Sequence, residues 1–533
     1  MKLTKLLFFL FSFFLICFSF AQDVKLKWSG TIDNDKTNMP FRILGKDETG
    51  YYITKAGSDF ALEKFDFEMN RIWTRPLAVN ISKSKETIYE KIVMTDKKII
   101  LFTCYYDKKT KTKFFYASEI SKEGVLDPTL NNVNSFADLD SKESIINDII
   151  LSEDKKSILL FTKIRDEKSD IDKLYYKVLD EKLVVIAQSI IELPKSSEKN
   201  KIQGYTFDSA GNIFIAYSVN VKKENKANGV ERDFNYYIMA FYPAKNEYKV
   251  IDLRKEYGME ANDFAIAKIV LKIDQNSTFI YATGFYSDEK SFAATGTFIM
   301  KIDLLKGSSV FAKKKVFDSA FLGEVYARSA DETDDKKKNP EDEAKKVKSF
   351  ERLYDYEIRK LFIDSNGELV LVSEQDYIES RTTTSTASTG VTTTHTTYYY
   401  YTMSVLVTKF DNTGERKWCA HFPKSQCAGI APGFYYSIGI FKQNENVYIM
   451  YNDNPLNGTK LLSKPSATTT AQKSQLALIT IDTNGKVIKS VLMAASSTGT
   501  GIEIPVKYCE QFSDKEVLVI GNLKDQYKIG KIE

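Results

Sequence analysis

Short apolar runs alternate with polar turns over most of the chain after residue 40. Three pairs of runs are joined by the same turn signature, Asp-x-x-Gly, at Asp47–Gly50, Asp208–Gly211 and Asp364–Gly367. The aspartate in such a turn can accept hydrogen bonds from the backbone that follows it, and the glycine can take a positive φ. The pattern therefore predicts antiparallel strand pairs and almost no helix.

Turns in equivalent positions recur along the chain. Weaker copies without glycine occur at Asp96–Lys98, Glu153–Lys156, Asp274–Asn276, Gln443–Asn446 and Ser513–Lys515. Together they make about eight turns spaced by roughly 50 residues or more, which is typical of propeller blades with insertions. We call the four strands of a blade A to D in chain order, so these turns join A to B. We predict an all-β fold, a β-propeller of about eight four-stranded blades, with seven as the alternative.

A second repeated turn lies before strand D. Asp411-Asn412-Thr413-Gly414 leads to Trp418, and a similar segment from Asp66 leads to Trp73. The last unit, residues 505–533, has only three strands, whereas the N-terminal segment with Trp28 has no partner. An unpaired C strand would be an open edge, so we expect the N-terminal strand to complete the last blade and close the ring. Trp28, Trp73 and Trp418 would then share one structural position that docks the blades.

Insertions are unevenly distributed. The longest stretches between predicted strands are residues 319–356, 377–401 and 452–474. They are B–C or D–A connections, which emerge on one face of a propeller, whereas the A–B and C–D turns on the other face stay short. Because function tends to lie on elaborated loops, the insertion-rich face is the candidate binding face.

One insertion has an unusual composition. Residues 382–401 are rich in threonine, serine and tyrosine and end in Tyr398, Tyr399, Tyr400 and Tyr401. Threonine and tyrosine favour extended structure, so we predict a protruding β-hairpin that turns at residues 388–390, with disorder as the alternative. Successive strand residues point to opposite sides, so about half of the tyrosines would be exposed. These four tyrosines and His395 are the candidate binding residues.

The N-terminus has the features of an export signal. Lys2 and Lys5 precede a run of leucine, phenylalanine and isoleucine that ends at Ala21. The run is shorter than the roughly 20 apolar residues that span a membrane, so we interpret residues 1–21 as a cleaved signal peptide rather than an anchor. The remaining chain, residues 22–533, would be a single propeller domain without a transmembrane segment. We expect an exported protein that is periplasmic, cell-surface or extracellular.

Composition argues against several chemistries. The net charge is +4, or +2 without Lys2 and Lys5, so we expect no attraction to nucleic acid. His395 and His421 are the two histidines. A catalytic triad or a zinc site would have to use one of them, so we expect neither a metal nor a histidine-based active site. In an exported protein Cys419 and Cys427 could form a disulfide, and buried free thiols are the alternative.

The segment from Asp411 to Trp418 resembles the tryptophan-docking repeat of quinoprotein-like eight-bladed propellers. In that repeat an aspartate, a Thr-Gly pair and a tryptophan four residues after the glycine recur in most blades. Here the Asp-to-Thr spacing is one residue shorter, and Trp73 lacks the Thr-Gly pair. Quinoprotein dehydrogenases would also carry adjacent cysteines, and this sequence has none. The resemblance therefore implies a propeller without that cofactor, comparable to the propeller subunit of the outer-membrane barrel-assembly machinery.

Two functions remain open from the sequence. We favour a non-enzymatic, monomeric scaffold whose insertion-rich face binds a protein or a glycan that the sequence does not identify. The alternative is a glycan-active hydrolase or lyase with paired carboxylates in the central funnel, because glycosidases need only two acids at a suitable separation. No motif selects such a pair.

Overall fold

The computed structural model describes residues 24–34, 38–57, 60–78, 80–82, 85–137, 146–166, 171–193, 200–225, 229–258, 265–274, 278–287, 293–327, 353–386, 388–390, 392–429, 434–497 and 501–533. The predicted signal peptide and most of the insertion at residues 319–356 lie outside this part of the chain. No helix among the described residues is long and apolar enough to cross a membrane.

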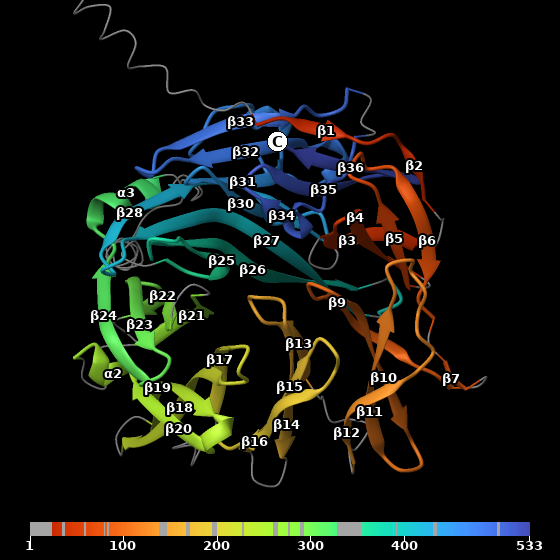
Figure 1. Cartoon of the computed structure of the whole chain (residues 1–533). Coiled ribbons are helices and arrows are strands. Elements are labelled where there is room, and N and C mark those ends of the chain that lie inside the picture. The colour runs from red at the N-terminus through yellow and green to blue at the C-terminus, as the bar shows by residue number, and fades with distance from the viewer. Residues whose placement is uncertain are drawn as a thin grey trace, which may run out of the picture.

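Eight sheets of four or five antiparallel strands follow one another around a ring (Figure 1). The first four blades are blade 1 with β3 (Asn38–Asp47), β4 (Gly50–Gly57), β5 (Phe60–Phe65) and β6 (Arg71–Pro76); blade 2 with β9 (Ile88–Met94), β10 (Ile99–Asp107), β11 (Thr112–Ile120) and β12 (Asn131–Phe136); blade 3 with β13 (Ile146–Leu151), β14 (Ser157–Asp166), β15 (Ile171–Asp180) and β16 (Val185–Ile191); and blade 4 with β17 (Asn200–Phe207), β18 (Ile213–Asn225), β19 (Gly229–Tyr242) and β20 (Glu247–Asp252).

The other four blades carry the additions. They are blade 5 with β21 (Ala265–Ile273), β22 (Phe279–Ser287), β23 (Gly296–Asp303) and β24 (Ser308–Val316); blade 6 with β25 (Tyr356–Ile363), β26 (Leu369–Thr386), β27 (Thr392–Phe410), β28 (Arg416–Phe422) and β29 (Gln426–Ala428); blade 7 with β30 (Gly439–Gln443), β31 (Asn446–Asp453), β32 (Gln475–Ile481) and β33 (Val487–Met493); and blade 8 with β34 (Glu510–Ser513), β35 (Glu516–Leu523), β36 (Gln526–Ile532), β1 (Leu26–Trp28) and β2 (Ile32–Asp33). The prediction of eight four-stranded blades is confirmed.

Short elements connect the blades. They are the ribbon β7 (Asn80–Ser82) and β8 (Lys85–Glu86), and the helices η1 (Pro243–Lys245), α2 (Leu253–Glu256), α3 (Ser319–Ala327), η3 (Pro455–Asn457), η4 (Ala471–Lys473) and η5 (Val506–Tyr508).

The ring closes by pairing the two ends of the described chain. Strand β1 lies antiparallel to β36, with Leu26 opposite Ile532 and Trp28 opposite Gly530. The backbone groups of Lys25 and Glu533 exchange two hydrogen bonds of 3.0 Å each. Strand β1 therefore takes the outer, D position of blade 8, as the sequence predicted, and it covers the edge that β36 would otherwise expose.

Eight apolar clusters of buried side chains form the core, one between each pair of neighbouring blades. Because middle strands have a blade on either side, they are buried on both faces and their sequences are nearly continuous apolar runs, as at Leu369–Val372 in β26. Outer strands have one exposed face. In β16, for example, Val185 and Ile190 are exposed, whereas Ala187 and Ile191 are buried.

The turns form by the predicted chemistry. The Asp411 Oδ1 atom accepts backbone hydrogen bonds from Thr413 at 3.0 Å and Glu415 at 2.9 Å, and Gly414 has a φ of 83°. Asp208 makes the equivalent bonds with Ala210 and Asn212, at 3.0 and 2.9 Å. These local contacts set the strand registers and so fix which side chains reach each rim of the ring.

Candidate functional site

The tryptophans do not all occupy the same position. Trp73 lies opposite Lys64 and Trp418 opposite Lys409, and both rings pack toward the next blade. Trp418 also donates from Nε1 to the Thr483 carbonyl at 2.9 Å. Trp28 lies opposite Gly530 and packs with the cluster between blades 7 and 8, which is the preceding side. The prediction of one shared position is wrong for Trp28, because a different register turns its side chain to the other face of the blade.

The proposed disulfide does not form. Cys419 and Cys427 are both free thiols. Cys419 pairs with Thr408 and Cys427 with Tyr401, seven residues apart along β27. At about 3.3 Å per residue the two positions are roughly 23 Å apart along the strand, far beyond the reach of a disulfide.

The Thr/Tyr segment forms the predicted hairpin. Strands β26 and β27 pair from Leu369 and Phe410 at the ring to Thr386 and Thr392 near the tip. Three threonine pairs face each other across the tip at Oγ1–Oγ1 distances of 3.1 to 3.5 Å: Thr382 with Thr396, Thr384 with Thr394, and Thr386 with Thr392. The described side chains of residues 378–396 are exposed, His395 included. In Figure 1 the two strands are the longest of blade 6 and extend well beyond their neighbours.

The four tyrosines alternate between two sides of the hairpin. Tyr401 stacks on Tyr377 with ring centres 5.0 Å apart, and Tyr399 lies 4.8 Å from the Arg381 guanidinium. On the opposite side Tyr398 is 54% exposed, and beside it Ile378 is 58% exposed. Tyr400 lies on this side as well and lines a cavity at the base of the hairpin. The exposed side therefore leads directly from the hairpin to the cavity.

This cavity, which we call the hairpin-base pocket, has a volume of about 220 Å³. Arg359 of β25, Asp376 of β26, and Tyr400 and Thr402 of β27 form one wall. The other wall comes from the connections to blades 7 and 8 and contains Tyr436, Ser437 and Lys507, with Ala428 of β29 between the walls. B–C and D–A connections meet here, so the pocket opens on the insertion-rich face.

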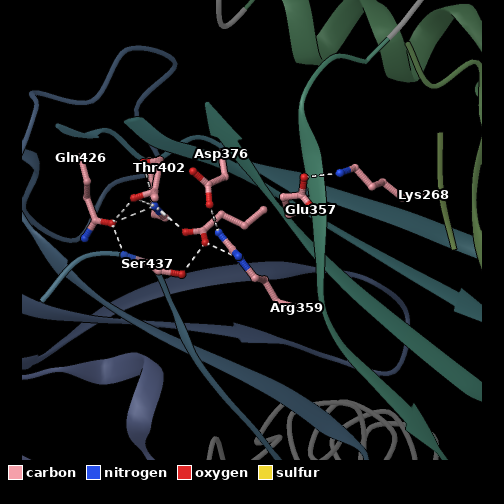
Figure 2. Close-up of polar contacts among 9 residues, drawn as sticks. Lys268, Glu357, Arg359, Asp376, Thr402, Gln426 and Ser437 are labelled. Carbon is pink, nitrogen blue, oxygen red and sulfur yellow. Dashed lines mark hydrogen bonds and ion pairs between the residues drawn. The ribbon is translucent and has the colours of Figure 1, made fainter. Parts of the chain in front are cut away.

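A buried ion-pair network supports the pocket (Figure 2). Arg359 donates from Nε to Glu374 at 2.8 Å and from Nη2 to Asp376 at 2.6 Å. Behind it, the Lys424 ammonium lies 2.8 Å from Glu374, and both side chains are fully buried. Burial lowers the pKa of Lys424, and the Glu374 carboxylate opposes that shift. Such a network is stable only while every partner is present, so it holds Arg359 in one place.

Gln426 joins this network to the second wall. Its side-chain oxygen accepts hydrogen bonds from Lys424 at 2.9 Å, from Thr402 at 2.7 Å and from the Ser437 backbone at 2.9 Å. In Figure 2 Thr402, Gln426 and Ser437 lie together on one side of Arg359, and the Glu357–Lys268 ion pair lies on the other. Ser437 has a φ of 86°, a left-handed conformation that costs energy in a non-glycine residue and is common at binding sites.

The insertion at residues 452–474 braces the same region. The backbone of Thr468 exchanges hydrogen bonds with Ser425 and Cys427 at 2.9 and 3.1 Å, which ties the insertion to β29. The buried Asn457 side chain bonds to Asp453 at 2.7 Å and to Ser466 at 3.0 Å. Because β29 also pairs with β27 at residues 400–402, it links the insertion at residues 452–474 to the base of the hairpin.

Three acids on the inner strands have a cation or a hydroxyl group nearby. Asp148 of β13 accepts from the Tyr205 hydroxyl at 2.6 Å and lies 4.0 Å from the Lys91 ammonium. Glu357 of β25 pairs with Lys268. Burial raises the pKa of Glu510 on β34, and nearby Lys155, Lys360 and Arg42 oppose that shift. Asp148 and Glu357 are thus paired with a hydroxyl group or a lysine on a neighbouring strand.

Sequence reasoning found Tyr400 and missed the rest of the pocket. Arg359, Asp376, Tyr436 and Lys507 come from four segments that meet only in the folded ring. One local signal was present, because Glu374 comes two residues after the apolar run of β26 that ends at Val372, and it is fully buried. A charge at the end of a core strand indicates a buried ionic partner, although not which residue supplies it.

Comparison with known proteins gives similar folds and no family. No protein-family profile matches the chain, and no curated protein sequence matches it. Among solved structures, the WD40 domain of SCAP from fission yeast is 9% identical, with a TM-score of 0.34 and coverage of 96% of this chain and 98% of that one. Sqt1 from Saccharomyces cerevisiae is 8% identical, with a TM-score of 0.39 and coverage of 95% and 98%. The α-L-arabinofuranosidase from Fusarium graminearum is 9% identical, with a TM-score of 0.30 and coverage of 66% and 92%. The assignment of the fold therefore rests on the strand pairing described above.

Proposed function

We propose that this protein is an exported, monomeric β-propeller scaffold that binds a protein or glycan partner on its insertion-rich face. The hairpin β26–β27 is the primary contact. The observation that carries the proposal is the continuous path from exposed Tyr398 and Ile378 to the pocket that Tyr400 lines. Exposed aromatic side chains on a rigid support are typical of binding surfaces.

The tip of the hairpin supports a binding role. The described residues at 382–386, 388–390 and 392–396 are all exposed, and they extend the two strands by several cross-strand pairs. A segment that adds exposed surface without burying apolar area contributes little to the stability of the ring. Contact with a partner would give this exposed surface a role.

We also propose that the protein is related to the tryptophan-docking propellers and that it is exported. The docking of Trp418 on the turn that contains Thr483 and Gly485 supports the first. The basic and apolar segment at residues 1–21 supports the second. We do not propose hydrolase or lyase activity, because both acids of the pocket network are bound to Arg359.

Capture of a partner from envelope and secreted fractions of the source cells tests the proposal. The immobilised chain is compared with Tyr398→Ser and with a tip-shortened variant, in which Asn-Gly replaces residues 382–396 and keeps Arg381 opposite Thr397. We expect both variants to reduce capture at least about tenfold, since exposed aromatic anchors dominate interface energies.

The matched control is Tyr248→Ser, because Tyr248 on β20 is 58% exposed, close to the value for Tyr398, and lies on another blade. This variant should capture as the unchanged protein does. Equal capture by all four proteins would exclude the hairpin as the contact.

A further inference from the structure

The hairpin-base pocket differs from the other two described cavities in charge. Its lining contains the cations Arg359 and Lys507 and the single acid Asp376, a surplus of one positive charge. The cavity of about 260 Å³ between blades 5 and 6 is lined by two lysines and two acids. The cavity of about 440 Å³ on the opposite face is lined by two lysines and three acids. A cationic surplus at the base of the proposed contact surface favours an anionic ligand.

The surplus charge resides on Lys507. Within the part of the chain that the structure describes, Arg359 meets Asp376 and Glu374, and Lys424 meets Glu374. Lys507 makes neither a hydrogen bond nor an ion pair with these described residues, and its ammonium lies 5.2 Å from the Tyr508 ring. Loss of solvation and the nearby Arg359 charge lower the pKa of Lys507, so an approaching anion would stabilise its charged form.

Arg359 is positioned to bind the same anion. Its Nε and Nη2 atoms are occupied by Glu374 and Asp376, and its Nη1 atom makes no hydrogen bond to any described residue. A guanidinium has five N–H donors in a fixed plane, so two bound acids do not exhaust it. Because the buried network fixes this plane, binding would require little reorganisation.

The rest of the lining suits a sugar ring. Tyr400 and Tyr436 supply aromatic faces. The Thr402 and Ser437 hydroxyls already donate to Gln426 and Glu374, so toward a ligand their oxygens can only accept. Burial raises the pKa of Tyr436 to about 12, so its hydroxyl stays a neutral donor. A volume of about 220 Å³ is smaller than the roughly 300 Å³ at which drug-sized pockets begin, and it suits a single monosaccharide residue.

We propose that the hairpin-base pocket binds the carboxylate of an acidic sugar residue, a hexuronate, between Lys507 and Arg359, with its ring against Tyr400 or Tyr436. This inference rests on the proposed binding function and names its ligand class. The lining carries one more positive than negative charge, so a ligand with a single carboxylate balances it. A glycan bearing such residues would continue from the pocket along the exposed side of the hairpin past Ile378 and Tyr398.

Titration with methyl β-D-glucuronide, followed by ligand-observed NMR and calorimetry, tests the inference. Methyl β-D-glucoside has the same ring without the carboxylate and is the ligand control. We expect the glucuronide to bind at least about tenfold more tightly, and Lys507→Ala to abolish that preference, because it removes a charge-assisted contact. Lys507→Arg should retain the preference.

The protein control is Lys473→Ala, which removes the same charge from an exposed residue of η4 in the neighbouring insertion. It should bind the glucuronide as the unchanged protein does. Equal binding of the two glycosides, or equal effects of Lys507→Ala and Lys473→Ala, would overturn the inference. Tighter binding of an N-acetylated dipeptide with a free C-terminal carboxylate would overturn the sugar assignment.

The inference and the proposed function can fail separately. Partner capture that depends on Tyr398 but not on Lys507, without any preference for the glucuronide, overturns only the ligand class. Glucuronide binding that depends on Lys507, with partner capture indifferent to Tyr398 and to the tip, overturns only the docking surface on the hairpin.

Discussion

The hairpin β26–β27 belongs to the ring at its base and leaves it at its tip. At the base, Glu374 is fully buried and bound by Arg359 and Lys424, and neighbouring insertions cover the strands. At the tip, the described side chains are exposed, and threonines face threonines. One pair of strands thus changes from a structural element to a projecting surface within a few residues. The difference indicates that the base positions a site and that the tip presents it.

The largest difference in stability between base and tip variants should come from removing Lys424 at the base. Removing Lys424 leaves Glu374 buried with one cation fewer and removes hydrogen bonds to Thr402 and Gln426. We expect Lys424→Ala to lower the free energy of unfolding by about 3–5 kcal/mol, the usual result of breaking a buried ion pair. Urea unfolding followed by tryptophan fluorescence measures it.

The control is Lys417→Ala, because Lys417 is exposed and pairs with Asp411 at 3.4 Å. It should cost less than about 1 kcal/mol. Similar losses in the two variants would mean that the base is not the rigid support described above.

Two glycines with almost the same backbone angle sharpen the contrast. Gly485 in the ring has a φ of 83° and Gly390 in the tip a φ of 79°, so alanine is strained at both. A Cβ on Gly485 would also lie 2.8 Å from the Trp418 ring, whereas nothing lies within 4 Å of one on Gly390. We expect Gly485→Ala to destabilise the protein by about 1–3 kcal/mol through strain and overpacking. Gly390→Ala should leave the unfolding midpoint unchanged, and equal effects would contradict the account.

Low pH should reduce stability through the carboxylates of the ring and not through the tip of the hairpin. Burial alone would raise the pKa of Glu516, but hydrogen bonds from Lys46 and Tyr51 outweigh it and hold this pKa below its ordinary value. The contribution of a carboxylate with a lowered folded-state pKa is present above its unfolded pKa, about 4.3, and is lost as the pH falls through the folded value. Glu516→Gln should therefore show a shallower loss of stability below pH 5 than the unchanged protein.

The tip-shortened variant is the comparison for this pH series. Residues 382–396 contain no acid, and His395 is their single titratable side chain. Its stability should therefore fall with the same slope below pH 5 as that of the unchanged protein. A changed slope would show that the tip is coupled to the acids of the ring.

The smallest effect should be that of shortening the tip itself. The described residues between 382 and 396 are all exposed, so replacing this tip with Asn-Gly should change the free energy of unfolding by less than about 0.5 kcal/mol. Urea unfolding measures this change too. A large loss would show that the tip packs on the ring and is part of the fold.

Most of the fold was predictable because it depends on features within short segments of the sequence. The Asp-x-x-Gly turns, the apolar runs and the missing fourth strand of the last blade are all visible within short segments, and the pairing of β1 with β36 followed from them. The face of a side chain depends on register to a single residue, which explains the wrong placement of Trp28. The disulfide prediction was wrong for a related reason. Cys419 and Cys427 are close in sequence, but they pair with positions of β27 that lie far apart along that strand.

The site was predictable only where its residues are neighbours in sequence. The tyrosine run stood out because four aromatic residues follow a threonine tract. Arg359 and Lys507 are ordinary residues in sequence, and their proximity arises from the closure of the ring, which brings blade 6 next to the connection between blades 7 and 8. No local pattern encodes such a contact.

Hydrogen exchange with and without the captured partner shows which face of the ring the partner covers. We expect slower exchange upon binding in residues 376–402 and around Tyr436, with unchanged exchange in the turns at residues 364–367 and 482–485 on the opposite rim. Protection confined to those turns, with none in the hairpin, would contradict it.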